Sequence, residues 1–292
     1  MKYTTYLLLT LIVCLSTFLT TCKKKDEFIK NPSQYLPVEK LNKIIVEAHT
    51  KIEANSEDIP AYIEEGIALY QKGMDCYPQA INQLKVALKL GVIDIRVFFY
   101  LAIMYDELNL SEKAFNYYEK FLRNYSKDFY MRLRYGNLFF RQNRYESASE
   151  QYELALSIEP KNQTALINLA LSYKARDLYT EALEKFELAE KLKPSFTPET
   201  LFKVAETYFL KNDFINTEKY YQKACAKKSD SIPSLLGLGK TYLKINKASE
   251  AKKCFEKVLS IEPNNEIAKK YMISKKSKCD TNTPHNPATS VR

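Results

Sequence analysis

A 34-residue repeat runs through most of this chain and restricts its fold more than any other feature. A charged residue followed by proline occurs at Glu159-Pro160 and again 34 positions later at Lys193-Pro194. A third pair, Glu262-Pro263, lies 103 positions after the first, which is three periods and one extra residue. A fixed period of this length is typical of proteins that stack small supersecondary units rather than enclose one globular core.

Within one period, apolar and small residues recur at intervals of three and four. Such intervals place side chains on one face of a helix. In residues 163–196 they predict a first helix with Leu166, Leu169, Ala170 and Tyr173 on its packed face, and a second with Ala182, Phe186 and Ala189. The small residue lets the second helix approach closely, the alanine of that helix faces it, and the aromatic fills the space toward the next repeat. Pro194 closes the unit because proline cannot donate the missing backbone hydrogen bond.

This pattern resembles the tetratricopeptide repeat. The resemblance covers six units, at 61–94, 95–128, 129–162, 163–196, 198–231 and 232–265, with Thr197 as an inserted residue. The first unit has two extra residues near Gly73–Pro78. The resemblance implies an all-α, right-handed superhelical solenoid of helix pairs, in which most of the 22 Tyr and 15 Phe are core residues. Only 6 Gly occur, which argues against folds that need many tight turns.

A stack of helix pairs needs a cover at each end. Apolar residues on one face of residues 37–60 predict an N-terminal capping helix, and residues 266–276 predict a C-terminal one, so that the solenoid spans 61–276. After these, the polar segment 277–292 is expected to be disordered. The net charge of +9 is partly concentrated in this lysine-rich end, so it is weak evidence for nucleic-acid binding.

The N-terminal sequence predicts an export signal. Lys2 is followed by an apolar run from Tyr6 to Leu19, too short for a typical membrane span. The sequence Leu19-Thr20-Thr21-Cys22 resembles a bacterial lipobox, which implies a signal peptide over 1–21, lipidation of Cys22 and a tether over 22–36. It also implies a location in the bacterial cell envelope, with the outer membrane as the expected site. Ordinary secretion and an uncleaved anchor over residues 3–21 remain as alternatives.

No catalytic motif is present in the sequence, so we expect neither an enzyme nor a bound cofactor or metal. His49 and His285 have no nucleophile or metal ligand nearby in sequence. Cys76, Cys225, Cys254 and Cys279 lack C-x-x-C spacing. Free or buried thiols are favoured for them, and a Cys225–Cys254 disulfide is the alternative.

Function then depends on surfaces. In the repeat family that the chain resembles, the first helices line a concave groove that holds an extended peptide or a partner helix. The resemblance assigns the following residues to it: Tyr130, Arg134, Asn137, Phe140, Arg141, Asn168, Lys174 and Lys203. Phe99 is expected near them, and Asp106 and Glu206 are expected to oppose the basic groups. Leu133 and Glu199 replace two lysines of the carboxylate clamp found in chaperone-binding relatives, so capture of a peptide C-terminus is not expected.

Repeats behind a lipobox resemble outer-membrane adaptor lipoproteins such as type IV pilotins. The resemblance implies a lipid-anchored scaffold that binds a protein or peptide partner, on the periplasmic side or at the cell surface. A surface-exposed adhesin or ligand-binding lipoprotein is the alternative. No nucleic acid and no small-molecule substrate are expected as partners.

Overall fold

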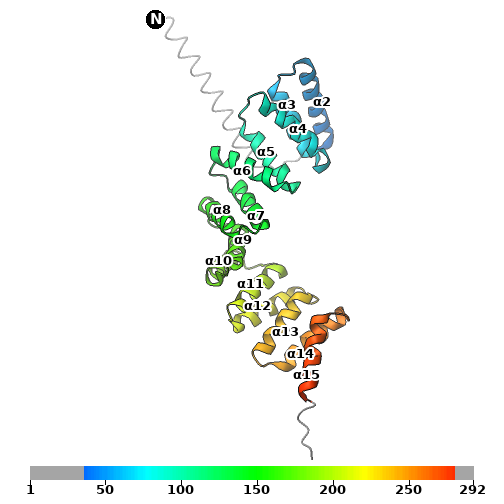
Figure 1. Ribbon diagram of the computed structural model, residues 1–292, viewed down its shortest axis with the longest axis vertical. Helices are drawn as coiled ribbons and strands as arrows, with labels where there is room; N and C mark the ends of the chain where they lie inside the picture. The colour runs from blue at the N-terminus through cyan, green and yellow to red at the C-terminus, as the bar shows by residue number, and fades with distance from the viewer. Residues whose placement is uncertain (1–35, 280–292) are drawn as a thin grey trace, which may run out of the picture. The chain divides into compact units, whose positions relative to one another are not determined.

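A computed structural model describes residues 36–279, with side chains as far as Met272 (Figure 1). All regular structure in this range is helical, and it contains no strand. The predicted all-α array of tandem helix pairs is therefore confirmed. Residues 1–35, which include the expected signal peptide and Cys22, and residues 280–292 lie outside the described part. The described chain divides into two compact units after Phe121.

The first unit begins with the helix that was expected to cap the stack. This helix, α2, packs along α3 and buries Leu41 and Ala48. The elements of the unit are α2 (Val38–Ala54), α3 (Ile59–Lys72), the 3-10 turn η1 (Met74–Cys76), α4 (Tyr77–Lys89), α5 (Ile95–Glu107) and α6 (Ser111–Asn124), whose last three residues belong to the second unit.

Close packing of α3 against α4 depends on Gly66. A Cβ atom added there would lie 2.7 Å from the side chain of Leu84, so a larger residue cannot occupy the position without a shift. The backbone turns at Gly73, whose φ of 122° favours glycine, and the η1 turn follows. This segment takes up the two extra residues expected near Gly73–Pro78.

The second unit consists of four helix pairs and a final helix. Each first helix packs most extensively against the helix that follows it (Figure 1). The elements are α7 (Phe129–Arg141), α8 (Tyr145–Ile158), α9 (Gln163–Ala175), α10 (Tyr179–Leu192), α11 (Pro198–Leu210), α12 (Phe214–Lys227), α13 (Ile232–Lys244), α14 (Ala248–Ile261) and α15 (Glu266–Cys279).

The turn within a helix pair uses a left-handed residue at a fixed position. Among the described residues, five that are not glycine have φ between 57° and 64°, namely Asn109, Asn143, Asp177, Asn212 and Asn246. Asn and Asp tolerate this conformation better than other side chains. In each turn the next N–H donates back to the carbonyl five residues earlier, as in Arg144 N to Phe139 O at 2.9 Å. This hydrogen bond ends the first helix in a Schellman motif.

The core of each pair is formed by a small residue on the first helix and a large one on the second. A Cβ atom on Gly136 would lie 2.6 Å from the ring of Tyr152, and one on Gly239 would lie 2.8 Å from the ring of Phe255. Tyr152, Phe186 and Phe255 are each 2% exposed or less. The aromatic residue expected to fill the space toward the next repeat thus also closes its own helix pair.

A partly buried ion pair joins α10 to α12, the second helix of the next repeat, through Glu190 of α10. Its carboxylate accepts hydrogen bonds from Tyr220 Oη at 2.5 Å and Lys223 Nζ at 2.9 Å, both on α12. Partial burial by itself would raise the pKa of Glu190. The hydrogen bonds from Tyr220 and Lys223 have the larger combined effect and hold this pKa below its ordinary value. The ionised carboxylate therefore favours the folded state.

We expect this contribution to disappear in acid. A carboxyl group with a lowered folded-state pKa stabilises the protein above its unfolded-state pKa, and the stabilisation is lost as pH falls through the folded-state value. Glu190→Gln should lower the urea midpoint at pH 7, and the difference from wild type should shrink as pH falls below about 4, the ordinary carboxyl range, and vanish below the lowered folded-state pKa. Glu184→Gln, at an exposed position of the same helix, is the control. A difference that is independent of pH would show that the charge of Glu190 contributes nothing.

Candidate protein-binding site

The residues assigned to the groove lie on three first helices of the second unit. Tyr130, Arg134, Asn137, Phe140 and Arg141 are on α7, Asn168 and Lys174 are on α9, and Lys203 is on α11. These helices belong to successive pairs, and α9 contacts both α7 and α11. The structure thus brings the eight residues to one run of neighbouring first helices.

Two asparagines and a tyrosine form the centre of this face. Asn137 Oδ1 accepts a hydrogen bond from Asn168 Nδ2 at 2.9 Å and another from Tyr152 Oη at 2.8 Å. Burial raises the pKa of Tyr152, so its phenol stays protonated and remains a donor. The carboxamide of Asn137 is therefore held in one orientation by residues from α8 and α9.

A depression of about 340 Å³ opens beside these asparagines. Asn137 Nδ2 and Asn168 Oδ1 make no hydrogen bond to the described part of the chain. The asparagine pair therefore offers a free donor on Asn137 and a free acceptor on Asn168. An extended peptide backbone presents the complementary N–H and C=O groups. The lining residues are Asn137, Phe140, Arg141, Tyr152, Asn168 and Leu171.

Arg134 and Tyr130 form an ordered pair on α7, the helix that carries Asn137. Arg134 Nη1 donates to Tyr130 Oη at 2.9 Å, and its guanidinium lies 5.7 Å from the centre of the same ring. Both side chains are half-buried. A guanidinium fixed on an aromatic ring loses little further entropy when it binds a carboxylate, which suits it for partner recognition.

The two lysines of the predicted site are not free cations. Lys174 Nζ lies 2.6 Å from Glu206 Oε2, and Lys203 Nζ lies 3.3 Å from the same atom. Glu206 was expected to oppose the basic groups, and its carboxylate contacts both lysines. Its ion pair with Lys174 joins α9 to α11. Neither lysine lines the depression, whose lining includes the basic residue Arg141.

Two other expectations are wrong. Phe99 and Asp106 were expected near the groove, but both are buried in the first unit, and Asp106 accepts a hydrogen bond from Tyr118 Oη at 2.9 Å. Their helix, α5, is buried almost throughout Val97–Asp106. Tyr152, which the repeat pattern predicts as a core residue, lines the depression, and so does Leu171. The sequence pattern does not show that the ring of Tyr152 and the side chain of Leu171 reach a depression in the surface.

The remaining chemistry-bearing groups are dispersed. In the described residues, no group of three or more His, Cys, Asp or Glu side chains could hold a metal ion. His49 lies on α2, 3.6 Å from Glu53 and 3.7 Å from the buried Glu65, rather than in solvent alone. Cys76, Cys225 and Cys254 are free thiols, and burial raises the pKa of Cys254 to about 11. Between residues 36 and 279, no helix is both long and apolar enough to cross a bilayer.

Sequence comparison finds the same repeat three times. Profiles described as "TPR repeat" and "Tetratricopeptide repeat" match residues 136–177, 232–265 and 96–128. The chain is 31% identical over 117 residues to human Superkiller complex protein 3, a match that covers 40% of this chain and 7% of that protein. It is 30% identical over 102 residues to human protein O-mannosyl-transferase TMTC2, covering 34% of this chain and 12% of the relative. The chain thus spans only a small part of these relatives.

Solved structures of other proteins share this fold. The C-terminal part of a TPR repeat-containing protein from Cytophaga hutchinsonii matches with a TM-score of 0.65 at 16% identity, covering 86% of this chain and 98% of that one. The Pseudomonas aeruginosa pilF structure has a TM-score of 0.57 at 20% identity, with 75% and 98% covered. YrrB, titled a TPR protein with an unusual peptide-binding site, has a TM-score of 0.54 at 18% identity, with 78% and 97% covered.

Proposed function

We propose that this chain is a tetratricopeptide-repeat scaffold for protein–protein interaction, and that it holds an extended segment of a partner protein on the face formed by α7, α9 and α11. We propose further that a lipid on Cys22 attaches it to a membrane of the bacterial cell envelope. In this role the chain catalyses no reaction.

The observation that carries the binding proposal is the amide pair of Asn137 and Asn168. Each carboxamide is oriented by one hydrogen bond to the other and keeps a free donor or acceptor at a solvent-open depression. Preorganised amide groups of this kind bind a backbone without the entropy cost of ordering the side chains first. YrrB, which has a similar fold, is described as having a peptide-binding site, and this supports the same use of the repeats here.

The sequence supports the anchor. Leu19 and Cys22 stand at the end of a short apolar run, and the polar segment from Lys23 to Leu36 then separates Cys22 from the first described helix. Two or more acyl chains make attachment to a bilayer stable, whereas one chain gives only reversible binding. A tethered scaffold of this kind would hold its partner close to the membrane, most simply the outer membrane. TMTC2 is named a transferase, but the match covers only 12% of it.

A comparison of two baits tests the binding proposal. Wild-type protein and the double variant Arg134→Ala/Asn137→Ala should be immobilised and exposed to the same detergent-solubilised membranes. At least one protein should be retained by the wild type and lost from the variant, because the variant lacks the oriented amide and the fixed guanidinium. Equal far-ultraviolet circular dichroism of the two baits is the control for folding. Identical sets of retained proteins would show that this face binds no partner.

A further inference from the structure

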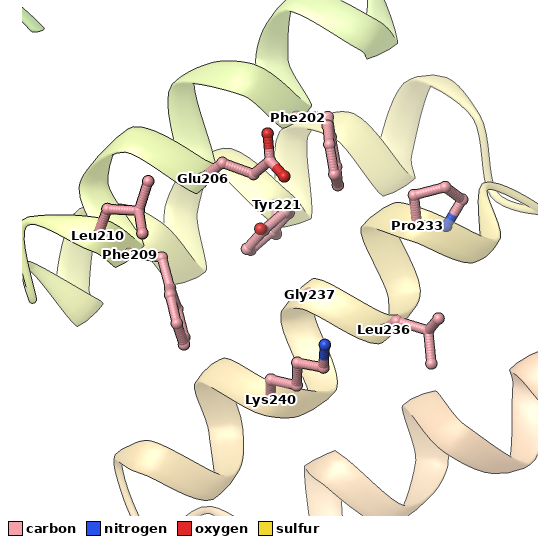
Figure 2. Close-up of a pocket in the computed structure, with 9 residues that line it drawn as sticks. All are labelled: Phe202, Glu206, Phe209, Leu210, Tyr221, Pro233, Leu236, Gly237 and Lys240. Carbon is pink, nitrogen blue, oxygen red and sulfur yellow. The ribbon is translucent and has the colours of Figure 1, made fainter. Parts of the chain in front are cut away.

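A second hollow in the second unit repeats the geometry of the first depression with different chemistry. Its lining includes Glu206, Phe209, Leu210, Tyr221, Gly237 and Lys240 (Figure 2). Each of these residues stands 69 positions after one that lines the first depression, in the same order. Because 69 residues are two repeats and the inserted Thr197, equivalent positions of α11, α12 and α13 form this hollow. We call it the Gly237 pocket.

The substitution that sets the Gly237 pocket apart is glycine at the position of Asn168. A Cβ atom on Gly237 would lie 2.3 Å from Cζ of Tyr221, so the ring of Tyr221 lies directly over the glycine backbone. Phe202 packs beside this ring, with the two centroids 5.8 Å apart. The result is a hollow of about 310 Å³ whose walls are mainly aromatic and aliphatic. That size is at the lower end of ligand pockets in general.

Two polar groups of the Gly237 pocket have no partner in the described part of the chain. The hydroxyl of Tyr152 bonds Asn137 in the first depression, but the equivalent hydroxyl of Tyr221 makes no hydrogen bond there. Glu206, which occupies the position of Asn137, is bonded instead to Lys174 and Lys203. The ammonium group of Lys240 also makes no hydrogen bond or ion pair with described residues. Burial raises the pKa of Tyr221, so the phenol remains a donor.

We propose that the Gly237 pocket receives a bulky apolar side chain of the partner protein, phenylalanine or leucine, followed or preceded by an acidic residue. The apolar side chain packs between Phe202, Phe209 and Tyr221. The adjacent carboxylate accepts hydrogen bonds from Lys240 and the Tyr221 hydroxyl, which are the two free donors of the site. This inference rests on the proposed function, because it assigns a specific part of the same bound segment to a second site two repeats away.

A small probe that combines both chemistries tests the pocket without knowledge of the partner. 3-Phenylpropionate carries an aromatic ring and a carboxylate, and its binding to the full chain can be titrated by ligand-observed NMR. Binding should weaken at least tenfold in Lys240→Gln, which removes the charge and keeps most of the length and the polarity of the side chain. Gly237→Ala should weaken it similarly by displacing the ring of Tyr221. Lys244→Gln, at an exposed position one turn further along α13, should leave it unchanged.

The amine 3-phenylpropylamine is the matched control ligand, because it keeps the ring and reverses the charge. Equal binding of the acid and the amine, unchanged affinity in Lys240→Gln, or no binding of the acid at 10 mM (roughly the limit of a weak subsite) would each overturn the proposal. These outcomes are distinct from failure of the bait comparison. Probe binding depends on the Gly237 pocket alone, whereas partner capture in that experiment depends on Arg134 and Asn137.

Discussion

Phe186→Ala should destabilise the protein by about 3–5 kcal/mol, the range found when a buried aromatic side chain is truncated in a packed core. Phe186 is 1% exposed and lies among the buried residues of α9 to α12, with Ala170, Leu183 and Leu201 in the same cluster. The alanine variant removes the ring and leaves a cavity that these helices cannot close, because each is fixed by its own neighbours.

Urea unfolding followed by circular dichroism measures this effect. Leu188→Ala is the control, since Leu188 is 43% exposed on the same helix and its truncation should cost well under 1 kcal/mol. A solenoid is stabilised by contacts between neighbouring repeats, so the loss should also weaken α11 and α12. If Phe186→Ala and Leu188→Ala had equal effects, the ring would not be the core element of its helix pair.

Cys22→Ala should release the protein from membranes completely. Each buried CH₂ of an acyl chain contributes about 0.8 kcal/mol, so two or more chains hold a protein on the bilayer, and a chain without them has no comparable attachment. The variant should appear in the soluble fraction, or remain as an unprocessed precursor of higher mass. Membrane fractionation with mass spectrometry of the N-terminus distinguishes these two results.

Cys14→Ala is the matched control, because Cys14 lies within the apolar run and has Val13 before it. It should leave both attachment and processing unchanged. If Cys22→Ala instead stayed fully in the membrane and was processed at the same site, the lipoprotein proposal would be wrong. An uncleaved anchor formed by residues 3–21 would give full attachment with no processing at all, and ordinary secretion would give soluble wild-type protein.

The sequence predicts the helix pairs well because their signals are local and repeated. Helices α7, α9, α11 and α13 start at residues 129, 163, 198 and 232, where the alignment of small and aromatic residues also begins its units. The turns within the pairs also have a local signal in the sequence. Asn109, Asn143, Asp177, Asn212 and Asn246 recur at 34 or 35 residues, and the single interval of 35 contains the inserted Thr197.

The surface was harder to predict because it depends on pairs of side chains from different repeats. The spacing places Lys174, Lys203 and Glu206 on first helices, but it does not show that one carboxylate bonds both lysines and removes them as free cations. In the same way, the sequence does not show that Asn137 and Asn168, 31 residues apart, bond to each other. The effect of Gly237 also appears only when the ring of Tyr221 from the preceding pair is placed over it.

The central claim is that a partner binds the face formed by α7, α9 and α11. The most direct test is calorimetric titration of the captured partner with the wild type and with Arg134→Ala/Asn137→Ala. Loss of two central contacts should cost about 2 kcal/mol or more, a roughly thirtyfold fall in affinity. Glu184→Ala/Lys191→Ala, on exposed positions of α10, should bind like the wild type. An affinity of Arg134→Ala/Asn137→Ala within twofold of the wild type, with helical content unchanged, would contradict the claim.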